Sequence, residues 1–483
     1  MPRKAAFLVL ILAFSLSGRS TTERTAEAKT GPETRILFTG DILLSRNIRN
    51  QIEREKIVPW QNLHPLFSGA TWVAGNLEGA VGRHEECLLQ DAKAPCFDIA
   101  SEHLKALKAA GFSALSIENN HSGDLGPKGR EQTANALAEE SILPFSLNDS
   151  PQFLKIGSVT VAVIAINTVQ GADGAPTAIP SIEVAQKLRL ARRLANLVIV
   201  SIHWGHELQD WAAAEQRLQA EWLMAHGADM IAGHHPHVVQ PAECIAGRPV
   251  FFSLGNHVFD QKYPATKTGL IADCRISGRK MTCGGILIQT PGQSFVPSAI
   301  GRSTTHDKAL ANCTVPLSQD FAVEEYTVSP QPWSAGKPLQ GTMLGIWKEG
   351  SLKWLSRRQE IVSMDAAPLA GAGMPTLLFS LERHYSPIDK EIGLRPYVYA
   401  VGSHGLVAKW RGSALAWPLL DAVILHDRNL VCALHRKDSF IAPDPTSDEA
   451  RVALYQWNGF GFRGVEDPEA LEECTRQFAE YIH

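Results

Sequence analysis

The stretch Ile36-Leu37-Phe38-Thr39-Gly40-Asp41 places a carboxylate just after a short apolar run. A run of this length and composition is typical of a buried strand. The same order, an apolar run followed by Asp, Glu, Asn or His, recurs in four further segments: Gly75-Asn76-Leu77-Glu78, Asn119-Asn120-His121, His203-Trp204-Gly205 and Gly233-His234-His235-Pro236-His237. Ligands bind beyond the carboxyl ends of the strands in open α/β sheets, so five such ends can converge on one site. A mixed oxygen and imidazole set suits one or two transition-metal ions.

Strand and helix signals alternate through the part of the chain that carries these segments. Residues 101–110 are predicted to form a helix that stops at Gly111, and residues 212–226 a helix that stops at Gly227. Such alternation predicts an α/β fold, with a mostly parallel sheet and helices on its faces. From about Gly269 the pattern changes to hairpins.

The chain after about Ser329 has a different texture. Its apolar segments are short, rich in Val, Tyr and Trp, and separated by Gly, Asn and Asp turns. We expect a mainly antiparallel β domain that closes with a helix over residues 468–482. The segments have some similarity to propeller blades, but no clean repeat period supports that architecture.

The first residues predict export. Arg3 and Lys4 precede an apolar stretch over residues 5–16, and Ser15-Leu16-Ser17 offers small residues at a cleavage position. The stretch is shorter than the ~20 residues of an ordinary transmembrane helix. We therefore expect a mature protein of the periplasm or cell envelope, with membrane contact only peripheral or through an uncleaved N-terminal segment.

Eight cysteines agree with an oxidising compartment. If Gly278-Arg279 forms a two-residue hairpin turn, Cys274 faces Cys283 within disulfide reach. Cys87 with Cys96 is a second local pair. The sequence does not assign Cys244, Cys313, Cys432 and Cys474.

Composition excludes a strongly basic protein. The net charge is -4 and 45% of the residues are hydrophobic, so sizeable cores are expected and no basic patch points to nucleic acid. The basic segment 189–193 is interpreted as the solvated face of a helix.

Six motifs, read together, resemble one family. They are Phe38-Thr39-Gly40-Asp41, Asn76-Leu77-Glu78, Asn119-Asn120-His121-Ser122-Gly123-Asp124-Leu125-Gly126, His203-Trp204-Gly205-His206-Glu207, His235-Pro236-His237 and Ser253-Leu254-Gly255-Asn256. This set resembles the CapA family, which is linked to poly-γ-glutamate capsule synthesis and is similar to a branch of the calcineurin-like metallophosphoesterases. The resemblance covers roughly residues 35–290 and implies a metallophosphoesterase-type α/β sandwich. It does not extend to the C-terminal part. Together with the patterns at the two ends of the chain, it predicts a signal peptide (1–17), a linker (18–33), a CapA-like domain (34–308), a connecting segment (309–334) and a β-rich C-terminal domain (335–483).

The resemblance also implies a metal scheme for one or two divalent ions, Mn, Fe or Zn. Asp41 and His237 would bind the first metal, and Glu78 would bridge both. The second metal would be held by Asn120, His203 and His235. His121 corresponds to the imidazole that protonates a leaving group, and Asp124 beside it would hydrogen-bond a ligand or a turn backbone. Two cations can clamp the attacking and leaving oxygens of a reaction, which explains the need for these residue types.

Two departures from the phosphoesterase pattern affect this scheme. Leu43 stands where that superfamily has the His of Asp-x-His, so we expect the metal position of Asp41 and His237 to be the less occupied one. Gly255-Asn256-His257 spells the phosphoesterase Gly-Asn-His motif, but it follows the His-Pro-His segment instead of preceding it. We therefore keep Asn120 and His121 as the functional pair, with Asn256 and Asp260 as residues that orient ligands.

Three further polar residues near these motifs have open roles. His206 and Glu207 either touch substrate or lie at the surface. His234 lies outside the His-Pro-His pattern and is not expected to bind a metal.

Three functions remain open on the sequence. The first is an exported, metal-binding CapA-like protein that acts in synthesis, release or transfer of poly-γ-glutamate or a related anionic polymer, with an envelope biosynthesis complex as a partner. The second is a divalent-metal-dependent phosphatase or phosphodiesterase of the periplasm or envelope, acting on a phosphoester substrate. The third is a non-catalytic polymer-binding module on the same scaffold.

Overall fold

The computed structural model describes residues 33–483 except 89–94, 148–150, 173, 175, 293, 335–340, 388–389, 413–414, 417, 438, 440–443, 445, 448 and 483. The expected signal peptide (1–17) and all of the expected linker except Glu33 lie outside the described residues. In the described ranges, no helix is both long and apolar enough to cross a membrane.

The first sheet contains the strand that ends in Gly40-Asp41. Its described strands are β1 (Thr34–Ile42), β2 (Trp72–Leu77), β5 (Ala114–Ser116), β6 (Leu143–Phe145), β13 (Asn256–Val258), β14 (Thr268–Ser277), β15 (Lys280–Gln289), β16 (Ser298–Arg302) and β17 (Thr314–Pro316). Their order is β16-β15-β14-β1-β2-β5-β6, with β13 beside β1 and β17 beside β15. The pairs within β13, β1, β2, β5 and β6 are parallel, and β14 to β17 add antiparallel hairpins.

The second sheet supplies the histidine-bearing strands. It consists of β7 (Gln152–Ile156), β8 (Val159–Asn167), β9 (Leu197–His203), β10 (Met230–His234), β11 (Ala242–Ile245) and β12 (Arg248–Phe251), in the order β11-β12-β10-β9-β8-β7. The central strands β8, β9, β10 and β12 are parallel. A two-stranded piece, β3 (Ala80–Val81) with β4 (Asp98–Ile99), lies apart from both sheets.

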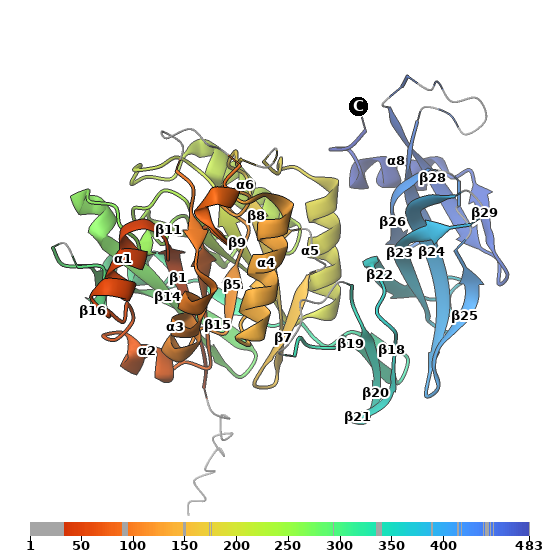
Figure 1. The fold of residues 1–483 in the computed structure, drawn as a ribbon. Helices are drawn as coiled ribbons and strands as arrows, with labels where there is room; N and C mark the ends of the chain where they lie inside the picture. Colours follow the sequence, from red (N-terminus) through yellow and green to blue (C-terminus); the bar gives the residue numbers. More distant parts are fainter. Residues whose placement is uncertain are drawn as a thin grey trace, which may run out of the picture.

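Helices flank the pair of sheets (Figure 1). They are α1 (Arg46–Arg54), α2 (His64–Ser68), α3 (Leu104–Ala110), α4 (Gly126–Glu139), α5 (Ile182–Leu194), α6 (Ala214–Ala225) and α7 (Thr304–Ala309), with short 3₁₀ turns at His84–Glu86, Ser101–His103 and Pro264–Lys267. The predicted helix over 101–110 begins as a 3₁₀ turn and continues as α3, which ends at Gly111 in the left-handed conformation (φ 108°).

The alternation of side chains along β1 explains the layers. Ile36 and Phe38 belong to the apolar cluster between the sheets, together with Val163 of β8 and Ile199 of β9. Leu37 points the other way, into a cluster with residues of α3 and α4. Residues of α5 and α6 cover the outer face of the second sheet. The predicted α/β sandwich is therefore confirmed.

The C-terminal part is built from antiparallel sheets, as the sequence predicts. In the described chain after Phe321, three four-stranded sheets follow one another, each in chain order. They are β18 (Ala322–Val323), β19 (Tyr326–Pro330), β20 (Leu344–Lys348) and β21 (Ser351–Leu355); β22 (Ile361–Ala367), β23 (Leu377–Ser386), β24 (Glu391–Gly402) and β25 (Gly405–Arg411); and β26 (Leu419–Leu425), β27 (Leu430–Arg436), β28 (Ala450–Trp457) and β29 (Phe462–Val465). Helix α8 (Pro468–Gln477) packs on the last of them.

The segment 309–334, expected as a connection, contains regular structure. It includes β17, which extends the first sheet, and β18 and β19, which begin the first C-terminal sheet. Val315, Val323 and Val328 are buried in it. The segment therefore contributes strands and buried side chains to both parts of the molecule.

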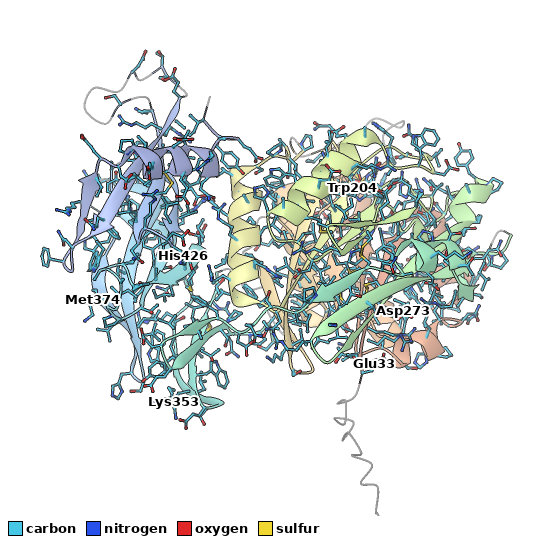
Figure 2. The ribbon with its side chains drawn as sticks, turned by 180° about the vertical axis from the view of Figure 1, so that it is seen from behind. Glu33, Trp204, Asp273, Lys353, Met374 and His426 are labelled. Carbon is cyan, nitrogen blue, oxygen red and sulfur yellow. A yellow bond between two sulfur atoms is a disulfide. The ribbon has the colours of Figure 1, made fainter. Side chains whose placement is uncertain are left out.

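The basic segment 189–193 lies on α5 at the junction of the two parts, so its interpretation as a solvated helix face was wrong. Arg189 forms an ion pair with the fully buried Asp421 of β26. Arg193 Nη2 lies 2.6 Å from Asp365 of β22, and His426, labelled in Figure 2, contacts the same carboxylate at 2.8 Å. The acidic partners come from the C-terminal part, which the local sequence pattern cannot indicate.

All eight cysteines form disulfides. The hairpin β14–β15 places Cys274 opposite Cys283, and these two residues are bonded, as are Cys87 and Cys96. The structure also assigns the four cysteines that the sequence left open, as Cys244–Cys313 and Cys432–Cys474. The first of these bonds joins β11 to the segment after α7, and the second joins β27 to α8.

Candidate metal centre

Polar residues from both sheets meet at the carboxyl ends of their parallel strands. Asp41 on β1 pairs with Asn76 on β2, and His203 on β9 pairs with His234 on β10. Two groups of side chains have ligand atoms that all lie within 4.8 Å of one another: Asp41, Glu78 and His203, and Glu207, His235 and His237. The five strand-end segments therefore converge as their sequence predicts.

Glycines before the polar residues allow this convergence. A Cβ on Gly40 would lie 1.8 Å from the carbonyl oxygen of Gly255, and one on Gly233 would lie 2.0 Å from that of Phe252. Real Cβ atoms do not approach so closely, so another residue at either position would push adjacent chain segments apart. The Gly-Asp and Gly-His pairs are thus a steric requirement of the site.

Asp41 is the centre of a buried network. Asn76 Nδ2 donates to its Oδ1 (2.9 Å), and the backbone N–H of His235 donates to its Oδ2 (3.2 Å). The Nδ1 atoms of His234 and His237 lie 3.2 and 3.3 Å from the carboxylate. Burial would raise the pKa of Asp41, but the two histidines outweigh it and hold this pKa well below its usual value. Asp41 is therefore ionised, as a metal ligand must be.

Glu78 is a buried carboxylate with one uncommitted oxygen. It is 1% exposed, and its Oε2 has no hydrogen-bond partner among the described residues. Burial raises its pKa to about 7. Its Oε1 lies 3.7 Å from His237 Nε2. Burial would lower the pKa of His237, but Glu78 and Asp41 together raise it to about 9. A cation would satisfy this buried oxygen and favour the ionised form of Glu78.

His203 and His235 are both neutral imidazoles. Burial lowers the pKa of His203 well below its usual value and that of His235 to about 3. His203 Nε2 lies 2.8 Å from Asn120 Oδ1. The ring centroids of His203 and His235 are 4.8 Å apart. His235 Nδ1 is buried without a hydrogen-bond partner among the described residues. The neutral form is the one that binds metals.

His121 lies at the rim of this cluster with one ring nitrogen fixed. Its Nδ1 is 2.9 Å from Asp124 Oδ2, and its Nε2 is 4.0 Å from Glu78 Oε1. The ring stacks on Phe97, with centroids 3.8 Å apart. The backbone N–H of Phe97 also donates to Asp124 (2.7 Å). Asp124, expected to bond a ligand or a turn backbone, thus contacts His121 and the backbone of Phe97 instead, and Nε2 of His121 faces the carboxylate cluster.

Comparison with known proteins identifies the family. The model of the family described as "Bacterial capsule synthesis protein PGA_cap" matches residues 35–261. "PGA biosynthesis protein CapA" of Bacillus subtilis (strain 168) is 30% identical over 275 residues, which cover 54% of this chain and 72% of that protein. The chain belongs to the CapA family.

Two further relatives are similarly distant. "Capsule biosynthesis protein CapA" of Bacillus anthracis is 29% identical over 290 residues, which cover 55% of this chain and 71% of that protein. A "Probable polyglutamine synthesis accessory protein" of Mycobacterium tuberculosis is 27% identical over 228 residues, which cover 42% of this chain and 60% of that protein. The family match contains all five strand-end segments and ends before β14, so the three C-terminal sheets lie outside it.

The second Asn-His pair of this CapA-family chain lies in a different environment. His257 is 1% exposed, stacks on Phe67 (centroids 5.8 Å apart) and also contacts the ring of Phe112. Neither of its ring nitrogens has a hydrogen-bond partner among the described residues. Asn256 does reach the cluster, because its Oδ1 lies 2.9 Å from His237 Nδ1. The motif therefore orients His237 through its Asn, while its His packs among apolar rings.

Some residues of the CapA-family site were not singled out from the sequence. Asn76 contacts both Asp41 and His203 (3.4 Å), and Asn119 Nδ2 donates to Asn76 Oδ1 (3.1 Å). His234, which was not expected to bind a metal, contacts the carboxylate of Asp41 at 3.2 Å. The signal for Asn76 was its place after Gly75 at a strand end. His234 is the last residue of its strand, and that position could have indicated it.

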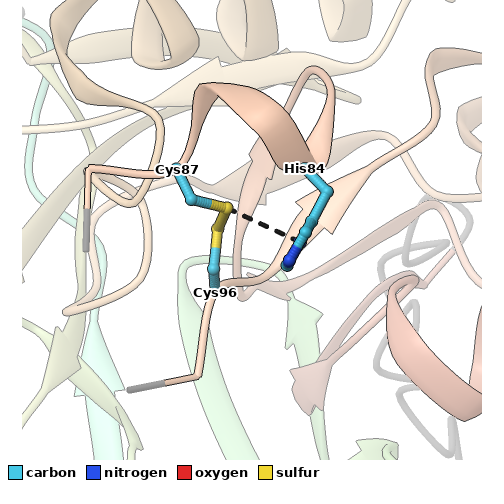
Figure 3. A group of neighbouring side chains, drawn as sticks. All are labelled: His84, Cys87 and Cys96. Carbon is cyan, nitrogen blue, oxygen red and sulfur yellow. Dashed lines mark hydrogen bonds between the residues drawn. A yellow bond between two sulfur atoms is a disulfide. The ribbon is translucent and has the colours of Figure 1, made fainter. Parts of the chain in front are cut away.

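A third group of potential metal ligands contains a covalent bond. His84 lies beside Cys87 and Cys96 (Figure 3), with its Nδ1 3.6 Å from Cys87 Sγ. The two sulfurs form a disulfide, so neither is a thiolate. This group is therefore a stabilising bridge, next to Phe97.

Proposed function

We propose that this chain is an exported, divalent-metal-dependent member of the CapA family that acts on poly-γ-glutamate or a related anionic polymer of the cell envelope. The observation that carries the proposal is the buried carboxylate and imidazole cluster with His121 at its rim. The names of the Bacillus and Mycobacterium relatives supply the substrate class.

The donor set fits a divalent metal. Asp41, Glu78 and His203 form one group of ligand atoms, and Asn120 Oδ1 lies next to His203. The buried Glu78 Oε2 has no hydrogen-bond partner in the part of the chain that the structure describes. Mixed oxygen and nitrogen ligands suit Mn, Fe or Zn. A bound ion supplies Lewis-acid stabilisation for charge that develops on a reacting oxygen.

His121 would deliver the proton that the leaving group needs. Asp124 holds Nδ1, which leaves Nε2 directed at the cluster. Phe97 covers one face of the ring and keeps water from it. A general acid in this position would contribute roughly 10²–10⁴-fold to the rate.

A phosphatase or phosphodiesterase activity is the second proposal. It is favoured by the two neighbouring groups of ligand atoms, because two-metal sites stabilise both oxygens of an in-line phosphoryl displacement. In this proposal the same His121 protonates the leaving alkoxide.

The deciding experiment combines metal analysis with turnover. Purified mature protein is analysed for bound Mn, Fe and Zn, then incubated with poly-γ-glutamate, followed by chain length, and with p-nitrophenyl phosphate esters. Bound metal with a change in polymer length supports the first proposal, and bound metal with ester cleavage supports the second. If the protein binds the polymer but binds no metal and turns over neither substrate, it is a binding module. Both proposals are then wrong.

Export is tested separately. Four disulfides agree with an oxidising compartment. We expect the mature protein in the envelope fraction, with its first residue near Gly18. Recovery of the full chain from the cytosol with Met1 still present would contradict this part of the proposal.

A further inference from the structure

Glu207 lies beside the histidines of the His235-Pro236-His237 turn. One of its carboxylate oxygens, one ring nitrogen of His235 and one ring nitrogen of His237 all lie within 4.8 Å of one another. Leu43, two residues after Asp41, has an aliphatic side chain without a lone pair and packs in an apolar cluster, so it offers no ligand. The carboxylate of Glu207 is an oxygen donor in addition to those of Asp41 and Glu78.

Backbone contacts between two loops place Glu207 there. The N–H of Leu208 donates to the carbonyl oxygen of Pro236 (2.9 Å). Glu207 precedes Leu208, and His235 and His237 flank Pro236, so this bond holds the segments of the three residues side by side. Leu208, His235 and His237 have φ values of 63°, 95° and 59°. Non-glycine residues seldom adopt this left-handed region, and such strain concentrates at functional sites.

The loop after Glu207 is also anchored. Gln240 is 1% exposed, and its Nε2 donates to the carbonyl oxygens of Gln209 and Trp211, both at 2.8 Å. Gln216 Nε2 in turn donates to Gln240 Oε1 (3.1 Å). The buried amide of Gln240 thus fixes the backbone of a loop whose own side chains are mostly exposed. The backbone that carries Glu207 is therefore held in place.

The histidines of this group have ligand atoms to offer. His235 is 6% exposed, and its Nδ1 has no hydrogen-bond partner among the described residues. In a tetrahedral site with metal–ligand distances of about 2.1 Å, two ligand atoms lie about 3.4 Å apart. Separations within 4.8 Å therefore need a contraction of about 1.4 Å or less. Glu207 is exposed and free to make that movement.

We propose that Glu207, His235 and His237 hold a second divalent ion, next to the ion held by Asp41, Glu78 and His203. This inference rests on the proposed metal dependence and names a new ligand for it. It also regroups the histidines, since the family resemblance pairs His237 with Asp41 and His235 with His203. Glu78 lies 3.7 Å from His237 and connects the two groups.

The test measures metal binding, with Mn²⁺ and Zn²⁺ as probes. Metal-depleted mature chain is titrated by calorimetry, and bound metal is counted after dialysis. Asp210→Asn is the matched control, because Asp210 is an exposed carboxylate on the same loop and the substitution makes the same charge change. We expect two ions on the wild type and on Asp210→Asn, and one ion on Glu207→Gln. His203→Ala should lose the other ion.

Substitution with Co²⁺ gives a second readout. The visible absorption of the Co²⁺ form should change on Glu207→Gln and stay unchanged on Asp210→Asn, because only a ligand alters the coordination geometry. Glu207→Gln that keeps the wild-type stoichiometry, dissociation constant and spectrum overturns this inference while metal dependence stands. A wild-type chain that binds one ion supports the inference if Glu207→Gln removes that ion, and contradicts it if only His203→Ala does. A wild-type chain that binds no ion overturns both proposals.

Discussion

Two segments of this chain share the pattern Asn-His-x-x-Asp, over residues 120–124 and 256–260. In the first, His121 bonds Asp124 and faces Glu78. In the second, His257 packs against two phenylalanine rings without a polar partner in the described chain, and Asp260 forms an ion pair with Arg46 instead.

The two asparagines differ less than the two histidines. Asn120 contacts His203, and Asn256 contacts His237, so each orients a histidine of the cluster. An asparagine needs only one contact to act in this way, whereas a proton donor needs a fixed nitrogen, a partner for the other nitrogen and access to the reacting atoms. The comparison shows that a motif can supply one role and lack the other.

The largest effect is expected at His203, the histidine that Asn120 of the first pair contacts. His203→Ala should remove the ion held with Asp41 and Glu78 and reduce turnover below detection, because the neutral imidazole supplies a ligand that Asn120 alone cannot replace. Metal content and turnover on the substrate that the wild type uses check this. Asn256→Ala is the control and should retain that ion; if Asn256→Ala or His257→Ala removes it instead, the two pairs have been assigned in the wrong order.

The next effect separates the two histidines. His121→Ala should slow turnover by about a hundredfold or more, because it removes the proposed proton donor, and should leave bound metal unchanged. His257→Phe should change neither. Equal losses of turnover in the two variants, measured at equal metal content, would contradict the distinction.

A smaller effect is expected at the two aspartates. Asp124→Asn should lower turnover by roughly tenfold or more, because the amide no longer stabilises the protonated ring of His121. Asp260→Asn should have a smaller effect, since its partner is Arg46. The pH dependence of turnover should change for Asp124→Asn alone. A profile identical to that of the wild type would show that Asp124 does not act through His121.

The smallest effect concerns stability in acid. Burial lowers the pKa of His257 from 6.5 to about 3, so the folded chain resists a proton that the unfolded chain binds. This contribution to the free energy of unfolding is present above pH 6.5 and is lost as the pH falls from 6.5 towards 3. On going from pH 7 to pH 5, the wild type should therefore lose about 2 kcal/mol more of its free energy of unfolding than His257→Phe does. Urea unfolding of both chains at the two pH values measures it, and an equal change in both would mean that His257 takes up a proton in the folded state.

The sequence by itself determined the strand ends, the glycines before them and the local disulfides. Apolar runs, turn residues and the hairpin register of Cys274 and Cys283 depend on neighbours a few residues away, so they can be predicted from local patterns. The same reasoning predicted an α/β fold and the antiparallel C-terminal part, and the resemblance of the six motifs implied the sandwich and the family.

Only the tertiary structure decided what each polar side chain contacts. It directed Arg189 to the buried Asp421, brought His234 to Asp41, set Glu207 beside His235, and surrounded His257 with rings. Each of these environments is made by segments far apart in the chain. The protonation state and partner of a side chain depend on burial and on nearby charges, which are properties of the assembled layers and not of the local sequence.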